Sequence, residues 1–179
     1  MANERKRNTA DAIDLLRDDH DRLQQLFDSV AGARRSTIEQ ACAELKIHFV
    51  LEAELLYPAA RAALGPDGAS IVDEAEGEHD VAARLVAELE RMAPADLRAA
   101  PTFAVLAACV RHHLDNERDR LFPVLRDSTL DIGALAAALH SRKEALLATE
   151  SPGQPEPSAE AEGAYEPELD EALARRLAG

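Results

Sequence analysis

The chain has 179 residues and a formal net charge of −14, with 46% hydrophobic residues, 3% aromatic residues and no tryptophan. This length fits one domain with a sizeable core and a tail, and apolar residues that are mostly Ala, Leu and Val favour helices over sheets. The negative charge argues against nucleic acid or an anionic membrane as partner, because both require a basic face. Without an apolar run long enough for a transmembrane helix or a secretory signal, the expected location is the cytoplasm.

Apolar spacing and capping residues predict five helices. The first is expected from an N-cap at Thr9 to about Ala31. The second begins with a capping box at 36–39 (STIE). It should end or kink near Pro58, because proline lacks the amide hydrogen and crowds the preceding turn.

After a Gly-Pro-Asp-Gly turn at 65–68, the third helix is expected over about 70–92 and the fourth over about 101–126. A fifth helix at about 131–149 is apolar on one side only. The segment that follows is rich in proline, glycine and acid and cannot bury enough surface to fold alone. Its last residues, PELDEALARRLAG, could form a short amphipathic helix that docks or stays mobile. We therefore expect one domain over 8–150 and an acidic tail over 151–179.

An internal repeat relates the helices in pairs. HFVLEAELLYPAAR, which starts at His48, is matched 65 residues later by HLDNERDRLFPVLR, which starts at His113. Likewise the tripeptide Asp-His-Asp at 19–21 is matched 59 residues later by Glu-His-Asp at 78–80. A duplicated helix pair predicts an all-α, up-down four-helix bundle with approximate two-fold symmetry, in which two equivalent half-sites meet.

Each half-site carries side chains that can bind a metal. A histidine and a glutamate four residues later share one helical face in each repeat, and the other two helices add one imidazole each. Four imidazoles and two bridging carboxylates suit iron, manganese or zinc. Burying them without a metal would cost on the order of several kcal/mol. The six candidate ligands are His20, His48, Glu52, His79, His113 and Glu117.

At these residues the chain resembles the hemerythrin-like (HHE cation-binding) family, over about 10–150. The ordered pattern H, HxxxE, H, HxxxE, with LYP or LFP after each HxxxE, is typical of that family. Oxygen-carrying hemerythrins have a further histidine four residues before the third-helix histidine, where this chain has Ala75. The sequence is therefore closer to the four-histidine bacterial type. This resemblance implies two iron ions, oxo- or hydroxo-bridged, and a role in peroxide, nitric oxide or iron handling.

The expected function is a di-iron protein that binds or reacts with a small oxidant (O2, H2O2 or NO), with catalase- or peroxidase-like turnover left open. One alternative is an oxygen or iron sensor, or an iron-handling protein without turnover, whose tail contacts an unidentified protein partner. Another is a structural zinc or manganese bundle.

Three further residues near the expected site are open to two interpretations. Tyr57 lies half a turn out of phase with the histidine that opens its repeat, so core packing is favoured unless Pro58 brings the phenol near the metal. Glu76 lies on the face of His79 and could replace the missing ligand. His112 adjoins His113 but falls outside the repeat register, so it is expected at the surface or beside a ligand.

The last candidates have ordinary structural interpretations. His140 stands alone on the fifth helix and is expected to be half-exposed. Cys42 and Cys109 are expected to be reduced thiols buried in the core.

Overall fold

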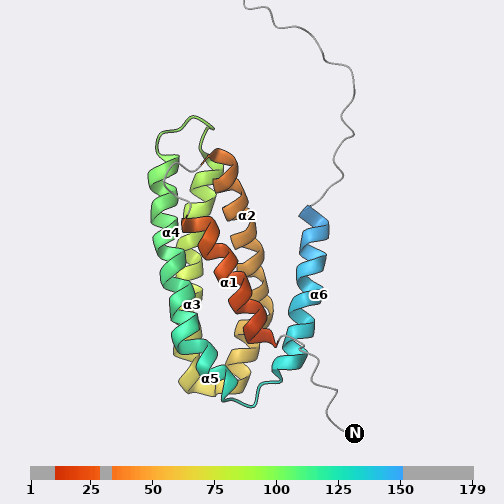
Figure 1. Ribbon diagram of the computed structural model, residues 1–179. Coiled ribbons are helices and arrows are strands. Elements are labelled where there is room, and N and C mark those ends of the chain that lie inside the picture. The colour runs from red at the N-terminus through yellow and green to blue at the C-terminus, as the bar shows by residue number, and fades with distance from the viewer. Residues whose placement is uncertain (1–10, 29–33, 151–179) are drawn as a thin grey trace, which may run out of the picture.

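Helices make up all the regular structure of the described residues, which are 11–28 and 34–150 of a computed structural model. In chain order they are α1 (Ala12–Asp28), α2 (Arg35–Leu51), the π-helical turn η1 (Glu52–Leu56), α3 (Tyr57–Arg91), α4 (Ala99–Asn116), the π-helical turn η2 (Glu117–Leu121), α5 (Phe122–Arg126) and α6 (Ile132–Glu150). Four helical rods form a bundle, and α6 lies outside it against α1, α2 and η1 (Figure 1). This confirms the predicted four-helix bundle with a fifth helix.

The helix starts differ from the predicted ones. Asp11 caps α1, because its carboxylate accepts the amide hydrogen of Asp14 at 2.9 Å. The expected cap Thr9 lies outside the described residues. The capping box at 36–39 is wrong, since the extended residue before α2 is Arg34 and its side chain makes no cap hydrogen bond. Ser36 is already inside the first helical turn and does not occupy the N-cap position.

Each HxxxE segment leads into a π-helical turn that precedes a proline. The amide of Tyr57 bonds to the carbonyl of Glu52, five residues back, and Phe122 bonds to Glu117 in the same way. A proline at the next position has no amide hydrogen and would crowd a regular turn, and the wider π turn makes room for its ring. The helix therefore does not end at Pro58; the distortion is a π turn just before it.

The second rod ends at Gly65, whose backbone has φ 62° and ψ −154°. This region is open almost only to glycine. Pro66 then starts the third rod in the first-turn position that proline prefers. The predicted turn at 65–68 is thus reduced to one residue, and the third rod begins about four residues earlier than expected.

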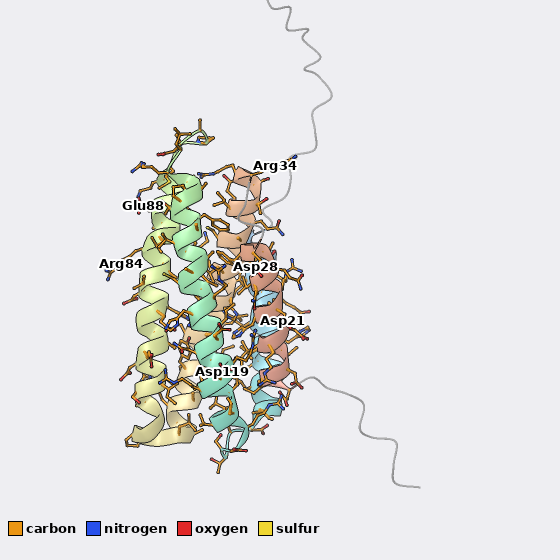
Figure 2. All side chains as sticks on the ribbon, turned by 60° about the vertical axis from the view of Figure 1, so that its left-hand side comes forward. Asp21, Asp28, Arg34, Arg84, Glu88 and Asp119 are labelled. Atoms are coloured by element: carbon orange, nitrogen blue, oxygen red, sulfur yellow. The ribbon has the colours of Figure 1, made fainter. Side chains whose placement is uncertain are left out.

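Two apolar clusters occupy the two ends of the bundle. One contains Leu16 and Leu121, and the other contains Leu23 and Phe103, the latter stacked on Phe27 at 5.1 Å. Charged side chains cover the outside, as Asp21, Arg84 and Glu88 show in Figure 2. The middle layer between the clusters holds polar residues. Within 11–28 and 34–150, none of the helices has the length and apolar character that crossing a bilayer requires.

Both cysteines are free thiols. Cys42 is buried, as expected, and burial raises the pKa of its thiol to about 11, which keeps it protonated and unreactive. Cys109 is half-buried, so the expectation of full burial holds for one of the two.

We predict opposite effects of alanine at two glycines of α3. Gly65→Ala should lower the free energy of unfolding by about 1–3 kcal/mol, because alanine is strained at positive φ. Gly77→Ala should raise it by about 0.5–1 kcal/mol, because Gly77 is helical and an added Cβ meets no atom within 4 Å. Urea denaturation measures both values, and equal effects at the two sites would contradict the break at Gly65.

Candidate metal centre

The buried polar or charged side chains of the described chain are the six that the sequence singles out. Each is at most 9% exposed, and Glu52 and His20 have no exposed surface. On every rod the polar residue lies between residues of the two apolar clusters, as His20 does between Leu16 and Leu23. The structure thus brings all six together in one layer: His20, His48, Glu52, His79, His113 and Glu117.

Glu52 lies at the centre of this layer, and its two oxygens face different imidazoles. Oε1 is 3.0 Å from Nε2 of His48 and 3.6 Å from Nε2 of His20. Oε2 is 3.1 Å from Nε2 of His79 and 3.6 Å from Nε2 of His113. One carboxylate therefore separates two pairs of histidines, which is the arrangement that a carboxylate bridging two cations would require.

Glu117 lies on the other side of the same layer. Its Oε2 is 3.3 Å from Nε2 of His20 and 4.0 Å from Nε2 of His113. Two groups of donor atoms result, each with all its members within 4.8 Å of one another. The first is His20, His48, Glu52 and Glu117, and the second is Glu52, His79 and His113.

Tyr57 packs in the core, as expected, and its hydroxyl also reaches the polar layer, which was the alternative left open for a distortion near Pro58. Its hydroxyl donates to Oε1 of Glu117 at 3.0 Å and lies 2.9 Å from Nε2 of His79. The physical reason is the π turn η1. The extra residue of a π turn shifts every later side chain by about 100° around the helix axis, which turns Tyr57 toward the face of His48.

Several atoms of the layer have no hydrogen-bond partner within the part of the chain that the structure describes. They are both ring nitrogens of His20 and of His48, both oxygens of Glu52, and Oε2 of Glu117. His48 and Glu52 approach to 3.0 Å without the geometry of a hydrogen bond. Buried polar atoms are normally paired, and unpaired ones are costly. The donor set, with imidazole nitrogens and carboxylate oxygens aimed inward, therefore fits a metal site.

The charges of this layer compensate one another. Burial alone would raise the pKa of Glu52, but the imidazoles of His48, His113 and His20 hold it well below its usual range. Burial alone would lower the pKa of His113, but Glu117, Glu52 and Glu78 raise it to about 10. Cations and anions thus stabilise one another here, and a bound metal would displace protons from the imidazoles.

Glu78 is a residue of the site that the sequence analysis did not identify. Its Oε2 is 3.0 Å from Nδ1 of His113, the nitrogen that faces away from the centre, and its Oε1 accepts from Asn116 at 2.7 Å. A carboxylate on the outer nitrogen of a metal-binding histidine fixes the ring and its tautomer. The sequence feature that could have identified Glu78 is its position directly before His79 in the repeated tripeptide.

Other candidates lie away from the donor atoms. Glu76 is 49% exposed and pairs with Arg61 at 2.8 Å on the surface. His140 is exposed on α6 beside Glu144. His112 is 67% exposed and contacts Glu78 at 3.2 Å, so it lies at the surface next to the residue that supports His113.

We predict that Glu78→Ala weakens metal binding without unfolding the protein. Loss of the carboxylate frees the ring of His113, and such partners typically account for about a 10- to 100-fold difference in metal affinity. Glu74→Ala is the matched control, since Glu74 lies about one turn earlier on α3 and pairs with Arg120. Competition with a chelator measures both affinities for ferrous iron. Equal affinities in the two variants would rule out a role for Glu78.

Comparisons with known proteins agree with this geometry. The fold is similar to the crystal structure of a hemerythrin HHE cation-binding domain-containing protein from Mycobacterium kansasii, with a TM-score of 0.67, 19% identity, and coverage of 79% of this chain and 90% of that chain. At that identity the likeness shows the fold alone. No curated protein sequence matches the chain. The sequence profile of the hemerythrin HHE cation-binding domain matches residues 11–125, which include all six clustered side chains. The chain therefore belongs to the hemerythrin HHE cation-binding family.

Proposed function

We propose that this protein holds two iron ions in the middle layer of the bundle and reacts there with a small oxidant such as hydrogen peroxide. The observation that carries the proposal is the position of Glu52. Its Oε1 faces His48 at 3.0 Å and its Oε2 faces His79 at 3.1 Å, so its two oxygens point to two separate ligand groups. A single ion would leave one of these groups unused.

The residues divide naturally between two ions. His20, His48 and Glu117 would hold one, and His79 and His113 the other, with Glu52 shared between them. Oε2 of Glu117 is nearer to His20, at 3.3 Å, than to His113, at 4.0 Å. The second group has one donor fewer, and the phenol oxygen of Tyr57 is close enough to complete it, at 2.9 Å from Nε2 of His79. Oxygen-carrying hemerythrins have a further histidine at the position of Ala75, and Tyr57 would take the place of that missing ligand.

The surroundings restrict what can react. Two bound iron ions would exchange the two electrons of peroxide disproportionation, which needs no outside reductant, and would leave coordination positions open. The apolar clusters on both sides exclude water from the donor atoms. Because every donor side chain is at most 9% exposed, only a small molecule can reach them. Large substrates are therefore not expected.

Iron content and peroxide consumption test the proposal together. We expect full-length protein from iron-replete medium to contain about two irons per chain and to consume hydrogen peroxide. His113→Ala should lower the rate about 100-fold or more, because it removes a ligand. His112→Ala, at the adjacent exposed position, should keep most of the activity.

Each contrary result points to a different alternative. Two irons without peroxide consumption would indicate a sensor or an iron-handling protein. Zinc or manganese in place of iron would indicate a structural site. A His113→Ala variant as active as the parent would contradict the catalytic proposal.

Tyr57→Phe tests the proposed phenol ligand. Burial, with Glu52 and Glu117 nearby, raises the pKa of Tyr57 and keeps the phenol protonated, whereas a bound cation would favour the phenolate. Ferric protein should therefore show a visible phenolate-to-iron absorption band. The variant should lose this band and keep about two irons per chain. A visible spectrum that is the same in both proteins would show that Tyr57 only donates to Glu117.

A further inference from the structure

The two half-sites differ in what surrounds their outer nitrogens, although the sequence repeat makes them equivalent. On the α3 and α4 side, Glu78 lies against Nδ1 of His113 and also binds Asn116. A hollow lined by Glu78 and Glu117 on this side has a volume of about 10 Å³. A cavity needs roughly 10–15 Å³ to hold one water molecule, so this hollow holds about one at most. His79, on the same side, is 9% exposed, against 2% for His48.

The α1 and α2 side is arranged differently. Asp19 is the repeat counterpart of Glu78, but it forms an ion pair with Lys143 of α6 and lies outside hydrogen-bond contact with His48. Nδ1 of His48 is buried and has no hydrogen-bond partner among residues 11–28 and 34–150. The fifth helix has no counterpart in the repeat. Its Lys143 pairs with Asp19, which therefore does not support His48 as Glu78 supports His113.

A cavity occupies the space between α1, α2 and α6, and we call it the α6 hollow. Its volume is about 440 Å³, and its lining includes His48, Asp19, Lys143 and Leu147. A second cavity of about 130 Å³ shares Asp19 and Lys143 with it, so this ion pair separates the two. A molecule in the α6 hollow lies one imidazole ring away from Glu52, since Nε2 of His48 is 3.0 Å from that carboxylate.

The half of α6 that covers this hollow is weakly attached. The first half is anchored by Leu135 and Leu139, which are 8% and 4% exposed. The second half is held by Leu146, which is partly buried against the core cluster, by Lys143, and by Arg142, which binds the carboxylate of Glu54 at 2.6 and 2.9 Å. Ion pairs this exposed each contribute only about 0–1 kcal/mol. The second half is therefore less firmly attached to the bundle than the first half.

We propose that the α6 hollow is the path by which small polar molecules reach the metal centre, on the side of His48, and that Lys143 on α6 controls its width. The lining combines apolar residues such as Leu23 and Ile47 with charged ones such as Asp19, Arg22 and Lys143, so a small polar molecule such as peroxide or azide finds polar contacts along an otherwise apolar wall. This inference rests on the proposed di-iron function. It adds that the ligand enters on the side of His48 and that α6 limits its passage.

Azide binding to full-length, iron-loaded protein tests this path. Stopped-flow absorption would give association and dissociation rate constants, and titration would give the Kd. An obstruction in a path slows arrival and departure by the same factor and leaves the Kd unchanged. Leu147→Trp should therefore lower both rate constants about fivefold or more, and Lys143→Ala should raise both, since it removes the side chain between the two cavities.

Two control variants locate the effect. Val105→Trp adds the same ring at a position on α4 with similar exposure, 54% against 50% for Leu147, and should leave the rates unchanged. Ile71→Trp adds it beside the small hollow on the opposite side of the centre. Slower azide binding in Ile71→Trp, with unchanged rates in Leu147→Trp and Lys143→Ala, would overturn the proposed path.

The remaining outcomes separate this inference from the function on which it rests. A parent protein that holds no iron would overturn both proposals. A parent with a normal azide spectrum, but with identical rates in every variant, would overturn the path alone. A changed Kd in Leu147→Trp or Lys143→Ala would show that the variant alters the centre itself, and this too would contradict the role of α6 as the wall of a path.

Discussion

The carboxylate of Glu52 is the interaction on which the rest of the structure depends. It has no exposed surface, and its oxygens contact imidazoles from all four rods of the bundle: His20, His48, His79 and His113. A buried carboxylate is costly unless cationic groups compensate it. Each rod places one imidazole beside this carboxylate, so Glu52 is compensated only when the four helices are in the correct register. Displacing one rod along the bundle would leave charge uncompensated in the interior.

The apolar clusters and the polar layer support each other. Leu16 and Leu23 flank His20 on α1, and equivalent pairs flank the histidines of the other rods. The clusters supply the free energy that holds the polar layer in place, and they lower the local dielectric, which strengthens every interaction inside it. Two π turns modify the helices next to the polar layer. Each accommodates a proline, and the first also turns the hydroxyl of Tyr57 toward His79 and Glu117.

The fifth helix breaks the symmetry of this plan. The repeat relates α1 to α3 and α2 to α4, but α6 packs on only one side of the bundle (Figure 1). There Lys143 binds Asp19, while on the other side Glu78 is free to support His113. Two half-sites that are similar in their inner ligands therefore differ in their outer surroundings. Glu78 thus orients His113 on one side, whereas Nδ1 of His48 on the other side has no hydrogen-bond partner among the described residues.

The sequence alone determined the bundle and the six inward side chains. A histidine and a glutamate four residues apart must share a helical face, and a duplicated helix pair must place its two faces opposite each other. Helical periodicity is a local property, so it can be read without the fold. It did not by itself place the hydroxyl of Tyr57 at the polar layer, because it assumes 3.6 residues per turn, and the π turn before Pro58 violates that assumption.

Only the tertiary structure decided what surrounds the six candidate ligand side chains. The neighbour of Asp19 is Lys143, 124 residues later in the chain, and Glu78 lies 35 residues before His113. No local pattern specifies such pairs, because they depend on how helices pack and on which carboxylate lies nearest to a cation. The inner layer was therefore predictable from spacing. The outer layer, which orients one histidine and leaves another beside a cavity, arises from contacts between distant segments.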